Sequence, residues 1–489
     1  MKPVKRWGLF LFLSILFILA GCAPLISKHI SQSLERPRPC EEFLNQLDAR
    51  VEEADVRDAA NVPVPGFPYL RTNRFLTALK KDLKDERAKE EWVRWMQKLD
   101  LEGRKKEINN LPNLDQPNRE ELLGRLEACS SELLKHDRNR SDFYQILYSQ
   151  ITVPDEYSFF RRAAGLYPLM VPAIAVATAK SRKKIRSWYE IDLKDLPVEG
   201  ELKTFVPERK ISLEEKEMRG VIEESMRNPL NVPLLNREEE KRLAQSFAPI
   251  FTQNVAAPYD RLGRVVWKDH GVEILPERPT VYYYFSHAFL KGNPILQINY
   301  VIWYSERAGQ RAPWMEHGHL DGLTARVSLD AEGRPFMVDV VNDCGCYHIF
   351  SPDKERVDRV ISQPFGFDPF VPQWLPPFFP GGRLGIRINS GWHQVERLIP
   401  GEEPSGAISY ELVPYNVLET LPHEDGQGES IFDRRGIAKD SKRAERFILF
   451  SMGIPSIGSM RQRGHHAIDL IERIHFDDPY LFDENFIFK

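Results

Sequence analysis

Three runs with apolar side chains at every second position, between residues 296 and 340, constrain the fold of this chain more than any other feature. Residues 296–304 place apolar side chains at every even position, and residues 323–329 repeat the alternation. The turn-forming segment 330–333 separates this run from a third alternating run at 336–340. Period two is typical of a β-strand, and turn residues between two such runs indicate a hairpin. We therefore predict a mostly antiparallel, β-rich domain over 256–430.

Helical spacing is found earlier in the chain and again near its end. Apolar residues recur at intervals of three and four in two stretches, Trp92, Trp95, Met96 and Leu99, then Leu122, Leu126, Cys129 and Leu133. Such a stripe lets a helix bury one face. Similar spacing returns at Ala467, Ile468, Ile471 and Ile474. The expected fold class is α+β, with a mainly helical region over 61–255, the β-rich domain, and a helical C-terminal extension over 431–489.

The N-terminus resembles the signal sequence of bacterial lipoproteins. Basic residues precede an apolar run at 7–20, which is shorter than the ~20 residues of a membrane-spanning helix. The run ends in Leu19-Ala20-Gly21-Cys22, which resembles a lipobox. The resemblance implies removal of residues 1–21 as a signal peptide and lipidation of Cys22, for example with palmitate. Residues 22–60 are then expected to form a tether.

The residue after Cys22 and the overall charge indicate location and partners. Ala23 in this position resembles the outer-membrane sorting pattern of Gram-negative lipoproteins, which implies an outer-membrane anchor facing the periplasm. Lys and Arg number 67 and Asp and Glu number 71 among 489 residues. Nucleic-acid binding needs a surplus of cations, so we expect no nucleic-acid partner. The expected partners are the membrane, through the lipid anchor, and an envelope protein or peptidoglycan.

Four cysteines remain besides Cys22, an even number that permits disulfide pairing. Export would place them in an oxidising compartment. Cys344 and Cys346 are two residues apart and cannot easily reach separate partners elsewhere. We therefore predict a disulfide between Cys40 and Cys129, across the helical region.

Residues capable of binding a metal concentrate between 316 and 348. Because a hairpin brings its two ends together, we expect His319 to lie beside Cys344, Cys346 and His348. Thiolate and imidazole together suit Zn²⁺, so these four residues are candidate metal ligands. The Cys-x-Cys spacing differs from the usual zinc motifs, and simple packing of these side chains is the alternative.

Two further chemistries use the same region. His319 and Asp321 could form an iron-binding facial triad with His393. Cys344 and Cys346 could instead cycle as a dithiol, with His348 lowering the pKa of one thiol. The chain lacks a nucleophile elbow, a P-loop and a dinucleotide fingerprint. Whether the protein is an enzyme is left open by the sequence.

Two apolar segments lie outside these patterns. Residues 163–179 carry no charge and are followed by a cationic cluster at 180–186. Such a segment can lie in a membrane interface, but Pro-broken apolar segments are common in cores, and we favour a buried helix with a solvated basic end. The Pro-rich aromatic segment 364–380 could form a rigid binding surface or cap the β-rich domain.

Three short stretches, 297–300, 320–323 and 344–348, resemble a group of uncharacterised proteobacterial proteins, a resemblance that implies no activity. The interpretation we favour is an outer-membrane-anchored periplasmic lipoprotein with a binding or structural role in the cell envelope. The alternative is a metal-dependent enzyme, using zinc or iron, with its site on the 316–348 hairpin.

Overall fold

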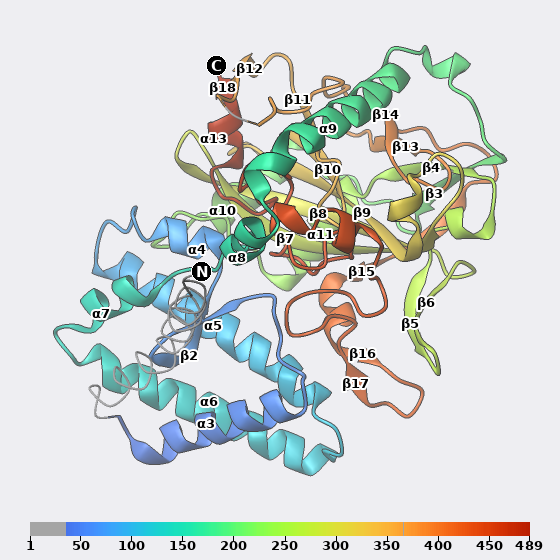
Figure 1. Cartoon of the computed structure of the whole chain (residues 1–489). Coiled ribbons are helices and arrows are strands. Elements are labelled where there is room, and N and C mark those ends of the chain that lie inside the picture. The colour runs from blue at the N-terminus through green and yellow to red at the C-terminus, as the bar shows by residue number, and fades with distance from the viewer. Residues whose placement is uncertain (1–35, 365) are drawn as a thin grey trace, which may run out of the picture.

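A computed structural model describes residues 36–364 and 366–489 of the chain (Figure 1). An N-terminal helical region lies beside a large mixed sheet, and short helices occur near the C-terminus. The predicted α+β class is confirmed. The predicted signal peptide, Cys22 and the first part of the tether, residues 22–35, lie outside the described residues.

Three long helices build the N-terminal region: α3 (Arg38–Glu53), α5 (Glu86–Asn110) and α6 (Gln116–Arg138). The hairpin of β1 (Val62–Val64) and β2 (Phe67–Thr72) and the short helices α4 (Arg74–Leu79) and α7 (Phe143–Gln150) pack with them. Asp85 and Asp115 cap α5 and α6 by accepting hydrogen bonds from the first-turn backbone. The predicted apolar stripes are confirmed, because Trp92, Met96, Leu126 and Leu133 are buried together.

The helix α3 corrects the prediction that residues 22–60 are only a tether. Its apolar side buries Phe43, Leu44, Leu47 and Val51, which recur at helical spacing. This side packs in the same core as α6. The tether prediction missed the helix because these apolar residues are interleaved with charged ones and follow two prolines.

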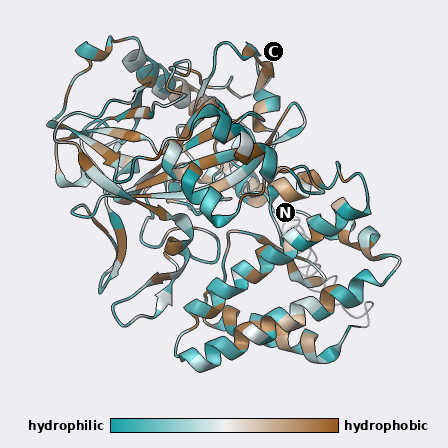
Figure 2. Cartoon of the chain, turned by 180° about the vertical axis from the view of Figure 1, so that it is seen from behind, coloured by the Kyte–Doolittle hydropathy of each residue, from teal (hydrophilic) through white to brown (hydrophobic). Residues whose placement is uncertain are grey.

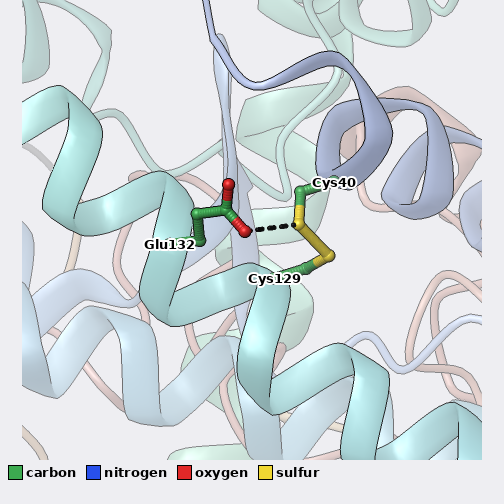
Figure 3. The surroundings of a disulfide bond; sticks show 3 residues. All are labelled: Cys40, Cys129 and Glu132. Carbon is green, nitrogen blue, oxygen red and sulfur yellow. Dashed lines mark hydrogen bonds between the residues drawn. A yellow bond between two sulfur atoms is a disulfide. The ribbon is translucent and has the colours of Figure 1, made fainter.

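A disulfide joins Cys40 of α3 to Cys129 of α6, as predicted (Figure 3). The two Cα atoms are 5.0 Å apart, although the residues are separated by 89 positions in sequence. Both cysteines are buried, and the Glu132 carboxylate lies 3.4 Å from the Cys40 sulfur. The bridge therefore ties the first described helix to the centre of the helical core.

The sheet contains ten strands in the order β11-β10-β9-β8-β7-β15-β3-β4-β13-β14. Its antiparallel half consists of β7 (Thr280–Leu290), β8 (Asn293–Arg307), β9 (Gly318–Leu329), β10 (Pro335–Asn342) and β11 (Ile349–Pro352). The mixed half consists of β15 (Ile408–Pro414), β3 (Glu201–Pro207), β4 (Ile250–Val255), β13 (Leu384–Ile388) and β14 (Val395–Pro400). The predicted hairpin is β9–β10, and its register pairs Val327 with Val338.

Strands β3 and β4 correct the predicted boundary at residue 255. Both lie in the region predicted to be mainly helical, yet they are inner strands of the sheet. Their sequences, ELKTFVP and IFTQNV, do not alternate between apolar and polar residues, so the period-two pattern of a strand is missing. Only their long-range pairing with β13 and β15 identifies them as strands.

The even positions of β8 confirm the predicted alternation. Leu296, Ile298, Tyr300 and Ile302 lie in one core with residues of β9 and β10, and with α10 (Glu215–Ser225) and α11 (Arg237–Phe247). The odd positions Gln297 and Asn299 face the other side and are buried as well. Figure 2 shows hydrophobic stretches on strands of the sheet, interrupted by hydrophilic ones. Both faces of this half of the sheet are therefore covered.

The C-terminal extension covers the polar face. Arg326 of β9 donates to the backbone oxygen of Phe476 at 2.5 Å, and its guanidinium carbon lies 3.6 Å from the centroid of that ring. The extension contains only short helices, α12 (Glu445–Ile448) and α13 (Leu481–Asn485), and the strand β18 (Phe486–Phe488), which pairs with β12 (Val357–Val360).

The helix suggested by the apolar spacing at 467–474 is not formed. Ala467 makes an isolated antiparallel bridge with His475, and the Tyr157 hydroxyl lies 2.8 Å from the backbone oxygens of Asp469 and Ile474. The backbone of this segment is thus engaged by contacts from elsewhere in the chain. Without helical geometry, Ile468 and Ile474 pack against a core cluster that includes residues of β10 and β11, and Ala467 packs with Tyr157 and Ile457.

The remaining elements are small or lie outside these layers. They are α8 (Phe159–Ala164), α9 (Tyr167–Tyr189), the hairpin β5 (Arg264–Lys268) with β6 (Gly271–Leu275), the pair β16 (Leu421–Pro422) with β17 (Gly428–Glu429), and five short 3₁₀ turns. Of the helices in the described part of the chain, none has the length and apolarity needed to span a membrane.

Candidate functional site

Buried charges meet where β8 ends and β9 begins. Arg307, the last residue of β8, donates two hydrogen bonds to Asp321, each at 2.9 Å, and one to Glu316 at 2.7 Å. Arg443 of the C-terminal extension also donates to Asp321, at 3.2 Å. All four side chains are nearly inaccessible to solvent. Two arginines therefore neutralise two carboxylates inside the protein.

His393 completes this charge cluster. Its Nδ1 lies 2.7 Å from Asp321 Oδ2 and its Nε2 lies 3.2 Å from Asp260 Oδ1. Burial alone would lower the pKa of His393, but hydrogen bonds and charges from Asp260 and Asp321 outweigh it and raise the pKa. Burial would raise the pKa of Asp321, yet Arg307, Arg443 and His393 hold it far below its usual range. The imidazolium form of His393 is thus stabilised between two carboxylates.

This arrangement does not provide the predicted iron triad. Asp321 and His393 are in contact, as that hypothesis required, but both carboxylate oxygens of Asp321 already accept hydrogen bonds from cations. His319 is exposed at the start of β9 and does not join them. The sequence pattern identified Asp321 and His393 but missed Asp260, Arg307 and Arg443, because nothing in the local sequence marks distant ion-pair partners.

Cys344 and Cys346 lie together in a tight turn that follows β10. The Gly345 backbone donates to Asn342 at 2.7 Å, and Gly345 has a φ of 89°. A side-chain carbon at position 345 would lie 2.2 Å from the backbone oxygen of Ala467, so the turn fits closely against the C-terminal extension. Both thiols are free, Cys344 buried and Cys346 half-buried.

The two thiols form a hydrogen bond and differ in acidity. The hydrogen bond from Cys346 and the positive charges of Arg307 and Arg443 lower the pKa of Cys344 to about 6, against the opposing effect of burial. The same hydrogen bond, burial and the charge on Cys344 raise the pKa of Cys346. The surroundings of the pair therefore favour a negative charge on Cys344 over one on Cys346.

Several polar atoms around this pair lack partners among the described residues. Nε and Nη1 of both Arg443 and Arg461 are buried without a hydrogen-bond acceptor, and Oε2 of Glu445 is buried without a donor. Burial and the neighbouring charges of Glu316 and Cys344 raise the pKa of Glu445 to about 8. The turn thus lies in a buried polar environment with spare guanidinium donors, which favours an anionic sulfur.

The structure does not assemble the four predicted metal ligands. It brings Cys344 and Cys346 together, but His348 binds Asp339 at 2.7 Å and packs its ring against Phe350 and Phe476. His319 is exposed. Within residues 36–364 and 366–489, no three His, Cys, Asp or Glu side chains are placed to hold a metal ion.

The reason is the turn at 342–346. The prediction continued the alternation of β10 through His348, but β10 ends at Asn342 and the chain reverses into β11. Ile349 pairs with Val340, so His348 returns to the face of the sheet that carries Asp339 and Arg326. Its imidazole therefore contacts Asp339 of the buried Arg326–Asp339 ion pair. His348 is thus directed away from the thiols of Cys344 and Cys346.

The aromatic segment 364–380 was predicted either to form a rigid binding surface or to cap the β-rich domain. Phe370 and Phe378 are buried, and Phe378 belongs to the main core beneath the sheet. Trp374 is 39% exposed. Phe370 and Phe378 therefore fold inward, as the capping interpretation proposed, whereas Trp374 stays exposed.

Comparison of the chain with protein-family models, with curated proteins and with solved structures finds no match. The assignment of function thus rests on the residues and the geometry described above.

Proposed function

We propose that this protein is a lipid-anchored protein of the bacterial cell envelope, held at the outer membrane and facing the periplasm, with a binding or structural role. The structural observation that supports the proposal is the buried Cys40–Cys129 disulfide. Structural disulfides form and persist in oxidising compartments such as the periplasm and are rare in the cytosol. The lipobox-like sequence ending at Cys22 supplies the proposed anchor.

Metabolic labelling with palmitate tests the proposal. The full chain is expressed with its own N-terminus, and Cys22→Ala is compared with the native protein and with Cys346→Ser as a matched cysteine control. We expect label on the native chain and on Cys346→Ser, and none on Cys22→Ala, because only the Cys22 thiol would accept lipid. The unlabelled variant is expected to keep residues 1–21.

Label on Cys22→Ala, or its absence from the native chain, would refute the anchor. Density-gradient separation of the membranes of the same cells tests the outer-membrane assignment. Recovery of the native chain with the inner membrane would contradict it.

A second candidate function is thiol–disulfide exchange at Cys344 and Cys346. The observation that favours it is a pair of free, adjacent thiols near two buried arginines, Arg443 and Arg461, whose Nε and Nη1 atoms have no hydrogen-bond acceptor among the described residues. The thiolate would attack one sulfur of a protein or low-molecular-weight disulfide and release the other sulfur as a thiolate. The second cysteine would then displace the bound sulfur, so that the substrate disulfide is reduced to two thiols and the pair is oxidised to Cys344–Cys346.

A further inference from the structure

The helices α8 and α9 expose apolar side chains that a soluble protein normally buries. Phe159 and Phe160 of α8 are 73% and 63% exposed, and Leu169 and Val176 of α9 are 73% and 72% exposed. The predicted burial of the segment 163–179 is therefore wrong. Of the residues in α9, only Ile174, Ile185 and Tyr189 are fully buried, and they form the inner side of the helix.

A neighbouring segment extends this exposed surface. Phe447 is 73% exposed on α12, and Ile448 and Phe450 are partly exposed beside it. The Ser158 backbone donates to Gly453 at 2.9 Å, and Arg162 donates to Met452 at 2.9 Å, so the segment lies directly against α8. We call the exposed apolar residues of α8, α9 and α12, together with Leu166 just before α9, the apolar face: Phe159, Phe160, Leu166, Leu169, Met170, Val176, Phe447 and Ile448.

The outward side of α9 changes from apolar to cationic along the helix. Exposed residues recur at intervals of three and four, with apolar side chains from Leu166 to Ala177 and then Lys180, Lys183 and Lys184. A helix on the surface of a globular protein usually shows the reverse, with its apolar side inward. Figure 1 shows α9 crossing the outside of the sheet region, and its last turns contact β14.

Charge identifies the kind of partner that fits. Residues 159–189 contain seven Lys or Arg and not one Asp or Glu, although the whole chain has a net charge of −4. An anionic surface complements such a segment, whereas a second copy of the chain would bring two cationic clusters together. An apolar helix side flanked by lysines matches the interface of a bilayer, where acyl chains lie next to phosphate groups.

We infer that the apolar face docks this protein onto a bilayer that contains anionic phospholipid. The aromatic and aliphatic side chains of α8, α9 and α12 enter the boundary between headgroups and acyl chains. Lys180 and Lys183 meet the lipid phosphates. The contact is peripheral, and it orients the sheet and the Cys344–Cys346 turn relative to the membrane. It goes beyond the proposed anchor, because it requires no lipid on Cys22.

Cross-linking to a photoactivatable phospholipid tests this inference. The full chain is mixed with vesicles of phosphatidylcholine and phosphatidylglycerol in equal parts, or of phosphatidylcholine alone, and cross-linked peptides are mapped. In the native chain we expect cross-links within 159–189 and around Phe447. Their yield should fall at least about fivefold without phosphatidylglycerol, since each lysine near an anionic surface contributes about 1 kcal/mol.

Matched variants separate the contribution of the apolar side chains to bilayer binding from that of the lysines. Leu169→Glu with Val176→Glu should abolish cross-links in 159–189, and Lys180→Gln with Lys183→Gln should remove the dependence on phosphatidylglycerol. Leu202→Glu changes a residue of β3 that is 44% exposed. It should leave the cross-links in 159–189 and their dependence on phosphatidylglycerol unchanged. All substituted residues are exposed, so the thermal unfolding midpoint should not shift.

Absence of cross-links from 159–189 in the native chain would overturn the inference, and this result does not depend on any variant. Cross-links between two copies of the chain through the apolar face would also overturn it. Cross-links confined to the N-terminal peptide would support a lipid anchor but contradict docking by the apolar face. Cross-links in 159–189 of an unlipidated chain would support docking even if the proposed anchor failed.

Discussion

At the scale of single residues, Cys344 is a free, buried thiol whose pKa is lowered by its neighbours. An ordinary cysteine thiol has a pKa near 8.5 and is mostly protonated at neutral pH. The pKa of Cys344 is lowered to about 6 by the hydrogen bond from Cys346 and by two buried arginines. Because the thiolate is the nucleophile in thiol chemistry, this residue is the first to examine for reactivity.

Titration of the thiolate absorbance measures this effect without requiring reagent access to a buried sulfur. After mild reduction that leaves Cys40–Cys129 intact, we expect one thiol of the native protein to ionise near pH 6. Cys346→Ala should raise that midpoint by more than one pH unit, because the stabilising hydrogen bond is lost. Cys344→Ala should remove the transition. A native protein in which both thiols ionise only above pH 8 would contradict this assignment.

At the scale of secondary-structure elements, the disulfide between α3 and α6 is a direct constraint on the helical region. It closes a loop of 89 residues, and a cross-link over a long loop removes much of the conformational entropy of the unfolded chain. The same helices are also held by apolar packing, since Phe43, Leu47 and Leu133 share one core. Loss of the disulfide should therefore weaken the helical region without preventing it from folding.

We expect Cys40→Ser with Cys129→Ser to lower the free energy of unfolding by about 2–5 kcal/mol. Chemical denaturation followed by circular dichroism measures the change. Cys344→Ser with Cys346→Ser is the matched control, since these two cysteines are not bridged. An unchanged denaturation midpoint in the Cys40/Cys129 variant would show that the bridge contributes nothing to stability.

At the scale of the whole molecule, one buried carboxylate connects three parts of the chain. Glu419 accepts hydrogen bonds from Arg463 at 2.7 and 2.9 Å and from Gln462 at 2.9 Å, both in the C-terminal extension. Lys106 of α5 lies 2.6 Å from its Oε2. Glu419 itself belongs to a 3₁₀ turn that follows β15. Helical region, sheet and extension thus meet at this side chain.

We expect Glu419→Gln to destabilise the protein by about 2–3 kcal/mol at neutral pH, because Arg463 and Lys106 lose their charged acceptor. Urea denaturation measures this change. Glu223→Gln, at an exposed position of α10, is the matched control and should have little effect. Equal stability of both variants would show that the three parts are held together without this carboxylate.

The lowered pKa of Glu419 predicts that its contribution to the stability of the protein depends on pH. Burial would raise the pKa of Glu419, but Arg463 and Lys106 outweigh it and lower the pKa to about 2. A carboxyl group with a lowered folded-state pKa stabilises fully above its unfolded pKa of about 4.5 and loses that contribution as pH falls toward 2. The stability difference between native protein and Glu419→Gln should therefore shrink from pH 5 to pH 2. A constant difference over this range would contradict the ionised state of Glu419.

Local periodicity was sufficient to predict much of the fold. The alternation at 296–340 identified β8, β9, β10 and the connecting turn, because side chains alternate between the two faces of any strand. The apolar stripes on α5 and α6 identified the helical region for the equivalent reason. The Cys40–Cys129 pairing followed from the number and spacing of the cysteines.

Three features were decided only by tertiary structure. His348 binds Asp339 because the turn at 342–346 reverses the chain, and Asp321 is engaged by arginines from distant segments. Leu169, Met170 and Val176 of α9 are exposed although the composition of residues 163–179 is that of a core helix. The spacing of apolar residues specifies which side of a helix or strand is apolar. Whether other parts of the chain pack on that side is determined only by the tertiary structure. Composition alone therefore located the segment at 163–186, and the fold determined that its apolar side faces outward.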